Sequence, residues 1–233
     1  MPDTKKELET LKKEYDHLKN KENENIWNKM YLIFKDLVLY NSVLTGNYLE
    51  LQEIAQEYET TLEEYNQDSS EYLRKKIGGI PLEFMRLLHN FILSAFSWIE
   101  NVRGQRNHLE KHYSNPISLE EYNQKKKELN LGKNHQFLKT LRNQFSHKLE
   151  KSAFSQVDFF PSLSNDGVNQ PIIFKEIKKQ VMVVVQEFYS GLQNFYTWFT
   201  GQLVVKYADE RLEAVNISYR LKKIEKQFEC KKY

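Results

Sequence analysis

Apolar residues recur every three or four positions along most of the chain, which is the spacing of helices that bury one face. Eight glycines and five prolines are few for 233 residues, and this composition favours long helices over a turn-rich β protein. The sequence therefore predicts an all-α helical bundle. The predicted helices span about residues 4–23, 26–44, 48–65, 71–77, 81–113, 118–132, 134–151 and 171–214.

Two glycine-containing breaks divide the first half of this pattern. Thr45-Gly46-Asn47 closes one predicted helix, and Gly78-Gly79 followed by Pro81 ends another beside the start of the next. The double glycine lacks a following GKS/T pattern, so a helix end explains it better than a phosphate-binding loop. The predicted division is an N-terminal helical extension at 1–77, a helical bundle at 78–215 and a basic C-terminal tail at 216–233.

The two ends of the chain carry signs of further packing. Leu8, Leu11, Tyr15 and Leu18 follow a 3-4-3 spacing, which predicts a helix that docks on its own domain or on a second subunit. The helix predicted at 171–214 is apolar on more than one face, so we expect it to pack against its own bundle and also against a partner.

Charge and cysteine content indicate the compartment. The formal net charge is only +2, so any basic surface must be local. A single cysteine, Cys230, forms no internal disulfide, and the N-terminus lacks an apolar signal core. No apolar run approaches the ~18 residues of a membrane span. We expect a soluble, cytoplasmic protein, with residues 152–171 as a long loop that has a functional or interface role.

The stretch at residues 138–149 combines a buried face with candidate chemistry. Arg142, Asn143 and His147 lie off its apolar stripe, and Asn143 and His147 are four positions apart, on one side of a helix. A permanent cation, a titratable imidazole and an amide that can orient it suit the handling of a phosphate. The apolar stripe consists of Leu138, Leu141, Phe145 and Leu149.

The segment Leu141-Arg142-Asn143 followed by Phe145-Ser146-His147 resembles the motif of the HEPN family, in which arginine precedes a polar residue and then histidine. Trp98 to Arg103 looks like the end of the helix that precedes this motif. The resemblance covers roughly residues 80–210. It implies a four-helix core and a metal-independent endoribonuclease, of the toxin or phage-defence type. In such an enzyme two motif helices meet across a homodimer axis and form one composite cleft.

The resemblance also implies roles for single residues. His147 would act as general base or acid, Arg142 would hold the scissile phosphate, and Asn143 would orient the imidazole or touch the phosphate. Ser146 is a weaker candidate for a polar contact. The basic run Lys125, Lys126 and Lys127 would follow the RNA backbone, although a solvated helix face explains it equally well.

Other arginine–histidine pairs fit the loose motif too. Arg103 precedes His108, and Arg106 precedes His112. We interpret these four residues as the hydrophilic end of a long helix, with extra cationic contacts near the cleft as the alternative. His17, His89 and His135 are isolated, and we expect them to be ordinary surface or core histidines.

Two alternatives to the nuclease complete the functional expectations. A non-catalytic helical binding or scaffold protein is the main rival to the nuclease, and a DNA-binding regulator has little support because no compact helix-turn-helix is visible. No His, Cys, Asp or Glu grouping has metal-site spacing, so neither a metal nor another cofactor is expected. The expected partners are RNA, a second copy of the chain and an antitoxin or regulatory protein, with no membrane.

Overall fold

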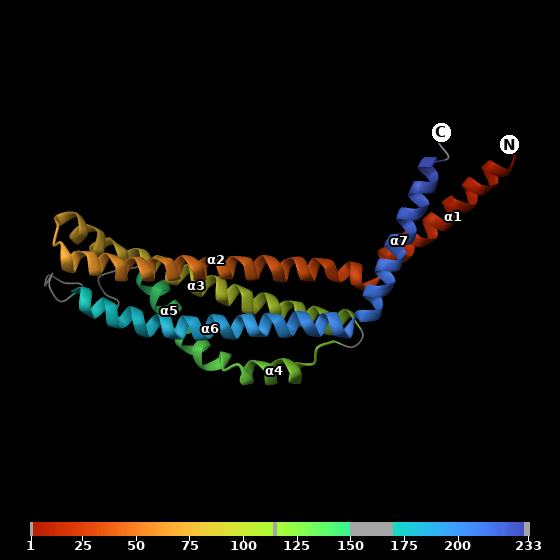
Figure 1. Ribbon diagram of the computed structural model, residues 1–233. Helices are drawn as coiled ribbons and strands as arrows, with labels where there is room; N and C mark the ends of the chain where they lie inside the picture. The colour runs from red at the N-terminus through yellow and green to blue at the C-terminus, as the bar shows by residue number, and fades with distance from the viewer. Residues whose placement is uncertain (1, 114–115, 150–169, 231–233) are drawn as a thin grey trace. The chain divides into compact units, whose positions relative to one another are not determined.

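The computed structural model describes residues 2–113, 116–149 and 170–230, with side chains at 6–113, 116–143 and 174–230, and nearly all of them lie in α-helices. These ranges contain no strand, so the predicted all-α bundle is confirmed. The helices (Figure 1) are α1 Pro2–Glu24, α2 Ile26–Gln67, α3 Glu71–His112, α4 Leu119–Glu128, α5 Leu131–Leu149, α6 Gln170–Lys206 and α7 Ala208–Cys230.

The helices form two compact units. The terminal unit comprises Met1–Leu37, Gln105–Ile117 and Trp198–Tyr233, and the central unit comprises Val38–Gly104 and Ser118–Thr197. Each unit therefore draws on segments that are far apart in the sequence. This grouping cuts across the predicted division at residues 77 and 215.

In the central unit, aromatic contacts hold α2, α3 and α6 side by side. The ring of Tyr48 on α2 stacks on Tyr189 of α6 with centroids 3.8 Å apart, and it lies 6.1 Å from Phe91 of α3. Trp98 of α3 meets Phe195 of α6 edge to face at 6.2 Å. Later residues of α3 thus pair with later residues of α6, so these two helices run parallel (Figure 1).

Both predicted glycine breaks are wrong, because α2 continues through Gly46 and α3 continues through Gly78, Gly79 and Pro81. A glycine inside a helix costs about 1 kcal/mol relative to alanine. Ile77 and Ile80, on either side of the double glycine, are both buried. Burial of one such side chain contributes roughly 1.5–3 kcal/mol, so packing outweighs the local preference.

In the terminal unit, α1 and α7 lie side by side and run in opposite directions (Figure 1). Their apolar core contains Leu18 from α1 and Ile217, Leu221 and Ile224 from α7. The docking of the N-terminal helix on its own chain is thus confirmed. The segment predicted as a basic tail is helical over residues 216–230, and its apolar residues pack on α1.

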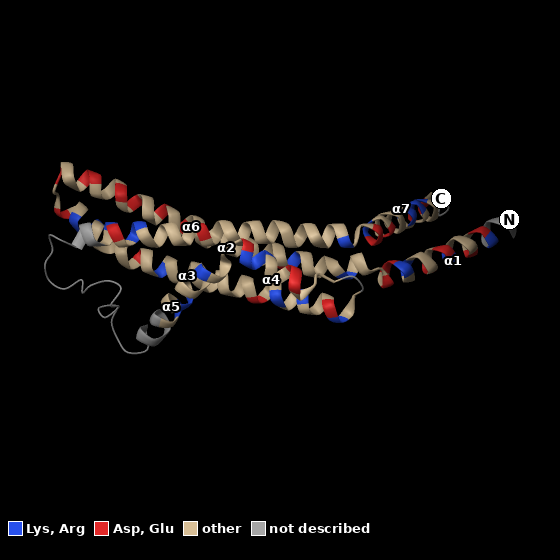
Figure 2. Ribbon diagram, turned by 90° about the horizontal axis from the view of Figure 1, so that it is seen from below, with Lys and Arg blue, Asp and Glu red and all other residues tan. Residues whose placement is uncertain are grey.

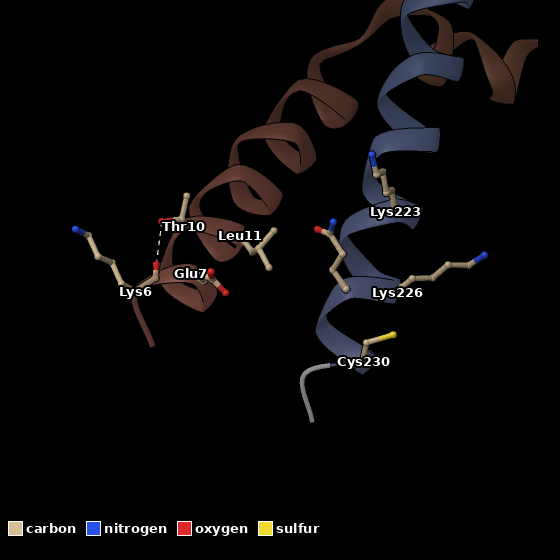
Figure 3. Close-up of a pocket in the computed structure, with 8 residues that line it drawn as sticks. Lys6, Glu7, Thr10, Leu11, Lys223, Lys226 and Cys230 are labelled. Carbon is tan, nitrogen blue, oxygen red and sulfur yellow. Dashed lines mark hydrogen bonds between the residues drawn. The ribbon is translucent and has the colours of Figure 1, made fainter. Parts of the chain in front are cut away.

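An open pocket lies where α1 begins and α7 ends. Figure 3 shows Leu11 of α1 directed toward α7, while Lys223, Lys226 and Cys230 come from α7. Thr10 donates a hydrogen bond of 2.9 Å to the carbonyl oxygen of Lys6 within α1. The pocket is a continuation of the groove between two helices, and its lining mixes lysines with apolar atoms.

The start of α4 confirms one predicted signal in detail. The Ser118 hydroxyl accepts a hydrogen bond from the Glu121 backbone N–H at 3.1 Å, and the Glu121 carboxylate accepts one from the Ser118 N–H at 2.8 Å. This reciprocal capping box satisfies two N–H groups that the first helical turn leaves unpaired. The ring of Tyr122 then packs edge to face on Phe195 at 5.2 Å and attaches α4 to α6.

Candidate functional site

The helix α5, which carries the predicted motif, is anchored in the central unit by its apolar face. Leu131, Leu138 and Leu141 are buried. A glycine on α6 makes room for the first turn, since a Cβ added at Gly191 would lie 2.8 Å from Leu131 Cδ2. This packing leaves Asn143 on the exposed side of the helix.

Arg142 and His135 share one aromatic neighbour, Phe96 of α3. The guanidinium carbon of Arg142 lies 4.6 Å from the centre of the Phe96 ring, and the His135 ring centroid lies 4.8 Å from it. The two residues are seven positions apart, which places them on the same side of α5 two turns from each other. Stacking on the ring restricts the guanidinium and adds a cation–π attraction.

Positive charges surround His135. Burial is the main cause that lowers the pKa of His135 below 6.5, and the charges of Lys126, Lys139 and Arg142 lower it further, while Glu100 acts in the opposite direction. His135 is therefore neutral at pH 7 and has a nitrogen that can accept a proton. We call the three cations Lys126, Lys139 and Arg142, together with the neutral His135, the cationic cluster.

The cavity beside this cluster is small. Lys126 and His135 line it together with apolar side chains, and its volume is about 60 Å³. A water molecule takes about 30 Å³ of liquid volume, so this cavity has room for about two water molecules and is too small for a nucleobase. An anionic chain would therefore have to bind on the surface of the cluster rather than inside the bundle.

The remaining motif residues continue along α5. The helix is uninterrupted to Leu149, so Asn143 and His147 occupy positions one turn apart on one side. The side chains of Ser146 and His147 lie outside the described residues. The arrangement of Arg142 with His147 thus stays a prediction, as does the expectation for residues 152–171, of which only 170 and 171 fall within the described backbone.

The predicted RNA-tracking lysines of α4 differ in their contacts. Lys125 Nζ lies 3.0 Å from Glu128 Oε2, and the Lys126 nitrogen lies 5.6 Å from the centre of the Tyr122 ring. Lys127 is exposed. Only Lys126 belongs to the cationic cluster, and the contact of the three lysines with an RNA backbone stays a prediction.

Of the two extra arginine candidates, Arg106 is buried and bound to other residues of the terminal unit. Its side chain is 4% exposed, its Nε donates to the Ile117 carbonyl oxygen at 3.3 Å, and one terminal nitrogen lies 2.7 Å from Glu110 Oε2. These contacts favour a structural role. Arg103, in the central unit, is exposed, with 3.7 Å between its guanidinium and Glu100 Oε1.

The structure adds His135, Phe96 and Lys139 to the sequence-derived candidates. The interval of seven between His135 and Arg142 is a signal that the sequence does contain, because it places both on one side of a helix. The contact with Phe96 has no such signal, since it joins residues about 40 positions apart on different helices.

Comparisons with known proteins give no further identification: no family model, curated protein or solved structure matches the chain. Among the described residues, no group of three or more His, Cys, Asp or Glu side chains is placed to hold a metal ion. Within the same residues, every helix falls short of the length and apolarity needed to cross a membrane.

Proposed function

We propose that this chain is a HEPN-type, metal-independent endoribonuclease that works as a homodimer. The observation that supports the proposal most is the cationic cluster of α4 and α5, in which the guanidinium of Arg142 lies over Phe96 next to a neutral imidazole. The same helix carries Asn143 and His147 in the register of the motif. Cations suit the binding of a phosphodiester, and a neutral imidazole suits the removal of a proton.

The proposed reaction uses the nucleophile that RNA itself carries. A histidine of the cleft, His147 in the proposal, takes the proton of the 2′-OH, and the 2′ oxygen attacks the adjacent phosphorus. Arg142 stabilises the negative charge on the pentacoordinate phosphate. A second acid, the protonated His147 of the other copy, gives a proton to the departing 5′ oxygen. The products are a 2′,3′-cyclic phosphate and a 5′-hydroxyl.

A nuclease of this kind would act as a toxin or phage-defence effector, with an antitoxin or regulatory protein as its partner. This part of the proposal depends on cleavage being shown first. Expression in cells then tests it: the parent protein should arrest growth, and the His147→Ala protein should not.

The decisive experiment is a gel assay of a mixed RNA substrate in the presence of EDTA. We expect the parent protein to cut the RNA and both Arg142→Ala and His147→Ala to lose at least a hundredfold in rate. Arg74→Ala is the matched control, because it removes an exposed arginine of α3 that is not a candidate site residue. Cleavage that survives His147→Ala would overturn the assignment of His147.

The His135→Ala variant separates the two histidines of α5. If His147 is the base, His135→Ala should mainly weaken RNA binding through changed packing at Phe96 and leave the maximal rate nearly unchanged. If His135→Ala loses the maximal rate and His147→Ala does not, the general base is His135 and not His147. Single-turnover kinetics at saturating RNA distinguish these two results.

A non-catalytic binding or scaffold protein is the second candidate. The observation that favours it is a groove between α2 and α3 of the central unit, whose apolar side chains include Leu39, Val43 and Leu93. No charged residue occurs from Leu37 to Leu49, although several of these side chains are exposed. An inactive parent that also remains monomeric would favour this function.

A further inference from the structure

The helix α7 is apolar on two opposite faces. Ala214, Ile217, Leu221 and Ile224 are buried, and three of them form the core with α1. About 180° around the helix, at 100° per residue, lies a second stripe made of Ala208, Leu212, Val215 and Tyr219. A helix with two apolar faces usually packs against a second neighbour as well as the first.

This second stripe is exposed to solvent. Leu212 is 62% exposed, Val215 58% and Tyr219 70%. Its members follow a 4-3-4 spacing, which is the a/d repeat of a coiled coil. With Leu212 and Tyr219 at a positions, the repeat continues into Lys222 and Lys226 at the following d and a positions.

We propose that this stripe binds the same stripe of a second copy of the chain, with the two α7 helices antiparallel. The charges beside the stripe are the argument for this occupant. Asp209 and Lys223 occupy e positions, and Arg211 and Glu225 occupy g positions. In an antiparallel pair, e positions face e positions and g positions face g positions across the axis.

One antiparallel register places each of the four charged residues opposite a residue of the other sign. When Val215 of one copy packs beside Tyr219 of the other, Asp209 faces Lys223 and Arg211 faces Glu225, and each pair occurs twice by the two-fold symmetry. Figure 2 shows the same polarity along α7, with acidic residues near its start and basic residues further along. A register shifted by one heptad places Asp209 against Asn216 and forms no such pair.

A parallel pair is disfavoured by the same residues. It would place Lys222 and Lys226 of one copy directly against Lys222 and Lys226 of the other, inside the apolar seam. In the antiparallel register, Lys222 instead lies beside Leu212, and its aliphatic stem can cover that side chain while its ammonium group reaches water.

The four flanking side chains are available for such contacts. Asp209, Arg211, Lys223 and Glu225 are all exposed. Arg211 lies 5.5 Å from the Trp27 ring, and Glu225 accepts a single hydrogen bond of 3.4 Å from the Tyr15 hydroxyl. A guanidinium has five donors and a carboxylate accepts several hydrogen bonds, so both groups can add a partner. The inference stands on the terminal unit alone and is independent of the proposed nuclease.

The mass of the full-length protein in solution tests the interface. We expect the double variant Leu212→Glu/Tyr219→Glu to have half the mass of the parent in sedimentation equilibrium, because the contact between the two α7 helices is lost while any contact through α5 stays. Tyr72→Glu is the matched control, because Tyr72 is 73% exposed on α3 in the central unit. Circular dichroism should show unchanged helix content, since the replaced side chains lie on the surface.

Charge reversal tests the antiparallel register. Asp209→Lys and Lys223→Asp should each raise the dissociation constant of the dimer by roughly tenfold, because each creates two like-charge pairs. The double variant Asp209→Lys/Lys223→Asp should restore the parent value. A parallel pair predicts no such rescue, because these two positions would not meet.

Three results would overturn the proposal. They are a parent protein that is still monomeric at about 50 μM, a Leu212→Glu/Tyr219→Glu protein with the same mass as the parent, and a charge-reversed double variant that associates more weakly than both single variants. RNA cleavage by the parent, measured separately, reports on the proposed nuclease. If the Leu212→Glu/Tyr219→Glu protein keeps the mass of the parent and still cuts RNA, the α7 interface is rejected and the nuclease proposal is unaffected.

Discussion

Lys178 of α6 is bound to Glu59 of α2 inside the central unit, with 2.6 Å between Lys178 Nζ and Glu59 Oε1. The same nitrogen donates to the Ala55 carbonyl oxygen at 2.8 Å and lies 5.1 Å from the centre of the Tyr58 ring. The lysine side chain is 5% exposed and the glutamate 31%. The pair therefore costs desolvation mainly on the lysine side, and it fixes how α6 lies along α2.

Because the two side chains are buried to different extents, their substitutions should lower the free energy of unfolding by different amounts. Glu59→Gln leaves a buried ammonium without its counter-charge and should lower the free energy of unfolding by about 2–3 kcal/mol. Lys178→Met leaves a partly exposed carboxylate that Lys175 approaches to 3.6 Å, so it should cost only about 1 kcal/mol. Urea denaturation measures both, with the half-exposed Lys175→Met as control. Equal costs for the two variants would contradict this account.

The lowered pKa of His135 predicts a pH dependence of stability. Its reference value is 6.5, and burial is the largest cause of the decrease. Because the unfolded chain takes up this proton more readily than the folded chain, the stability that His135 contributes is present above pH 6.5 and is lost as the pH falls below it. We expect the melting temperature to fall between pH 7.5 and 5.5, and to fall less in His135→Gln.

A matched control for this measurement is His17→Gln, which removes an exposed histidine from α1. It shows how far the removal of a histidine side chain by itself changes the measured slope. His89, which is also lowered in pKa by burial, remains in both proteins and accounts for part of the residual slope. An identical slope in the parent and in His135→Gln would show that burial does not act on His135 as described.

Two glycines of α6 should respond in opposite directions to alanine. Gly191→Ala places a Cβ 2.8 Å from Leu131 Cδ2 and 3.4 Å from the Leu129 carbonyl oxygen, so the start of α5 must move, and we expect a loss of about 1–3 kcal/mol. Gly201→Ala meets nothing within 4 Å and should gain about 0.5–1 kcal/mol from helix propensity. Thermal unfolding compares them; a stabilising Gly191→Ala would show that Leu131 adapts freely.

The stacking of Arg142 predicts that charge alone does not suffice for RNA cleavage. Lysine at this position keeps the positive charge but loses the planar fork that holds two phosphate oxygens and stacks on Phe96. In the proposed nuclease, Arg142→Lys should reduce the cleavage rate by roughly tenfold or more. Arg74→Lys, at an exposed arginine of α3, is the control and should cut RNA at the parent rate. Full activity in Arg142→Lys would reduce the role of Arg142 to charge.

The sequence predicted helices well and their ends poorly, for one physical reason. The capping box of Ser118 and Glu121 is a local interaction, and it forms as the sequence indicates. The breaks at Gly46 and Gly78 are also local preferences, yet there the buried residues on either side pack against other helices and hold the chain helical. A local signal therefore prevails only where no tertiary packing opposes it.

The candidate site shows the same limit. Arg142 and Asn143 were predicted from their spacing on one helix, and the structure places them on α5, with Arg142 half-buried and Asn143 exposed. His135 was interpreted as an isolated histidine because its relation to Arg142 passes through Phe96 of another helix. Likewise, Ile217, Leu221 and Ile224 fell within the predicted basic tail, since the helix they cover, α1, lies about 200 positions earlier.

That separation has a consequence for the growing polypeptide. Asn25, at the end of α1, donates to the Glu210 carbonyl oxygen, 185 positions later. At a synthesis rate of about 5–20 residues per second, α1 leaves the ribosome roughly 10–40 seconds before α7 exists. During this interval Leu11, Tyr15 and Leu18 have no α7 to cover them, and the many lysines and glutamates around them keep the nascent helix in solution. The terminal unit therefore completes its core only after α7 has been made.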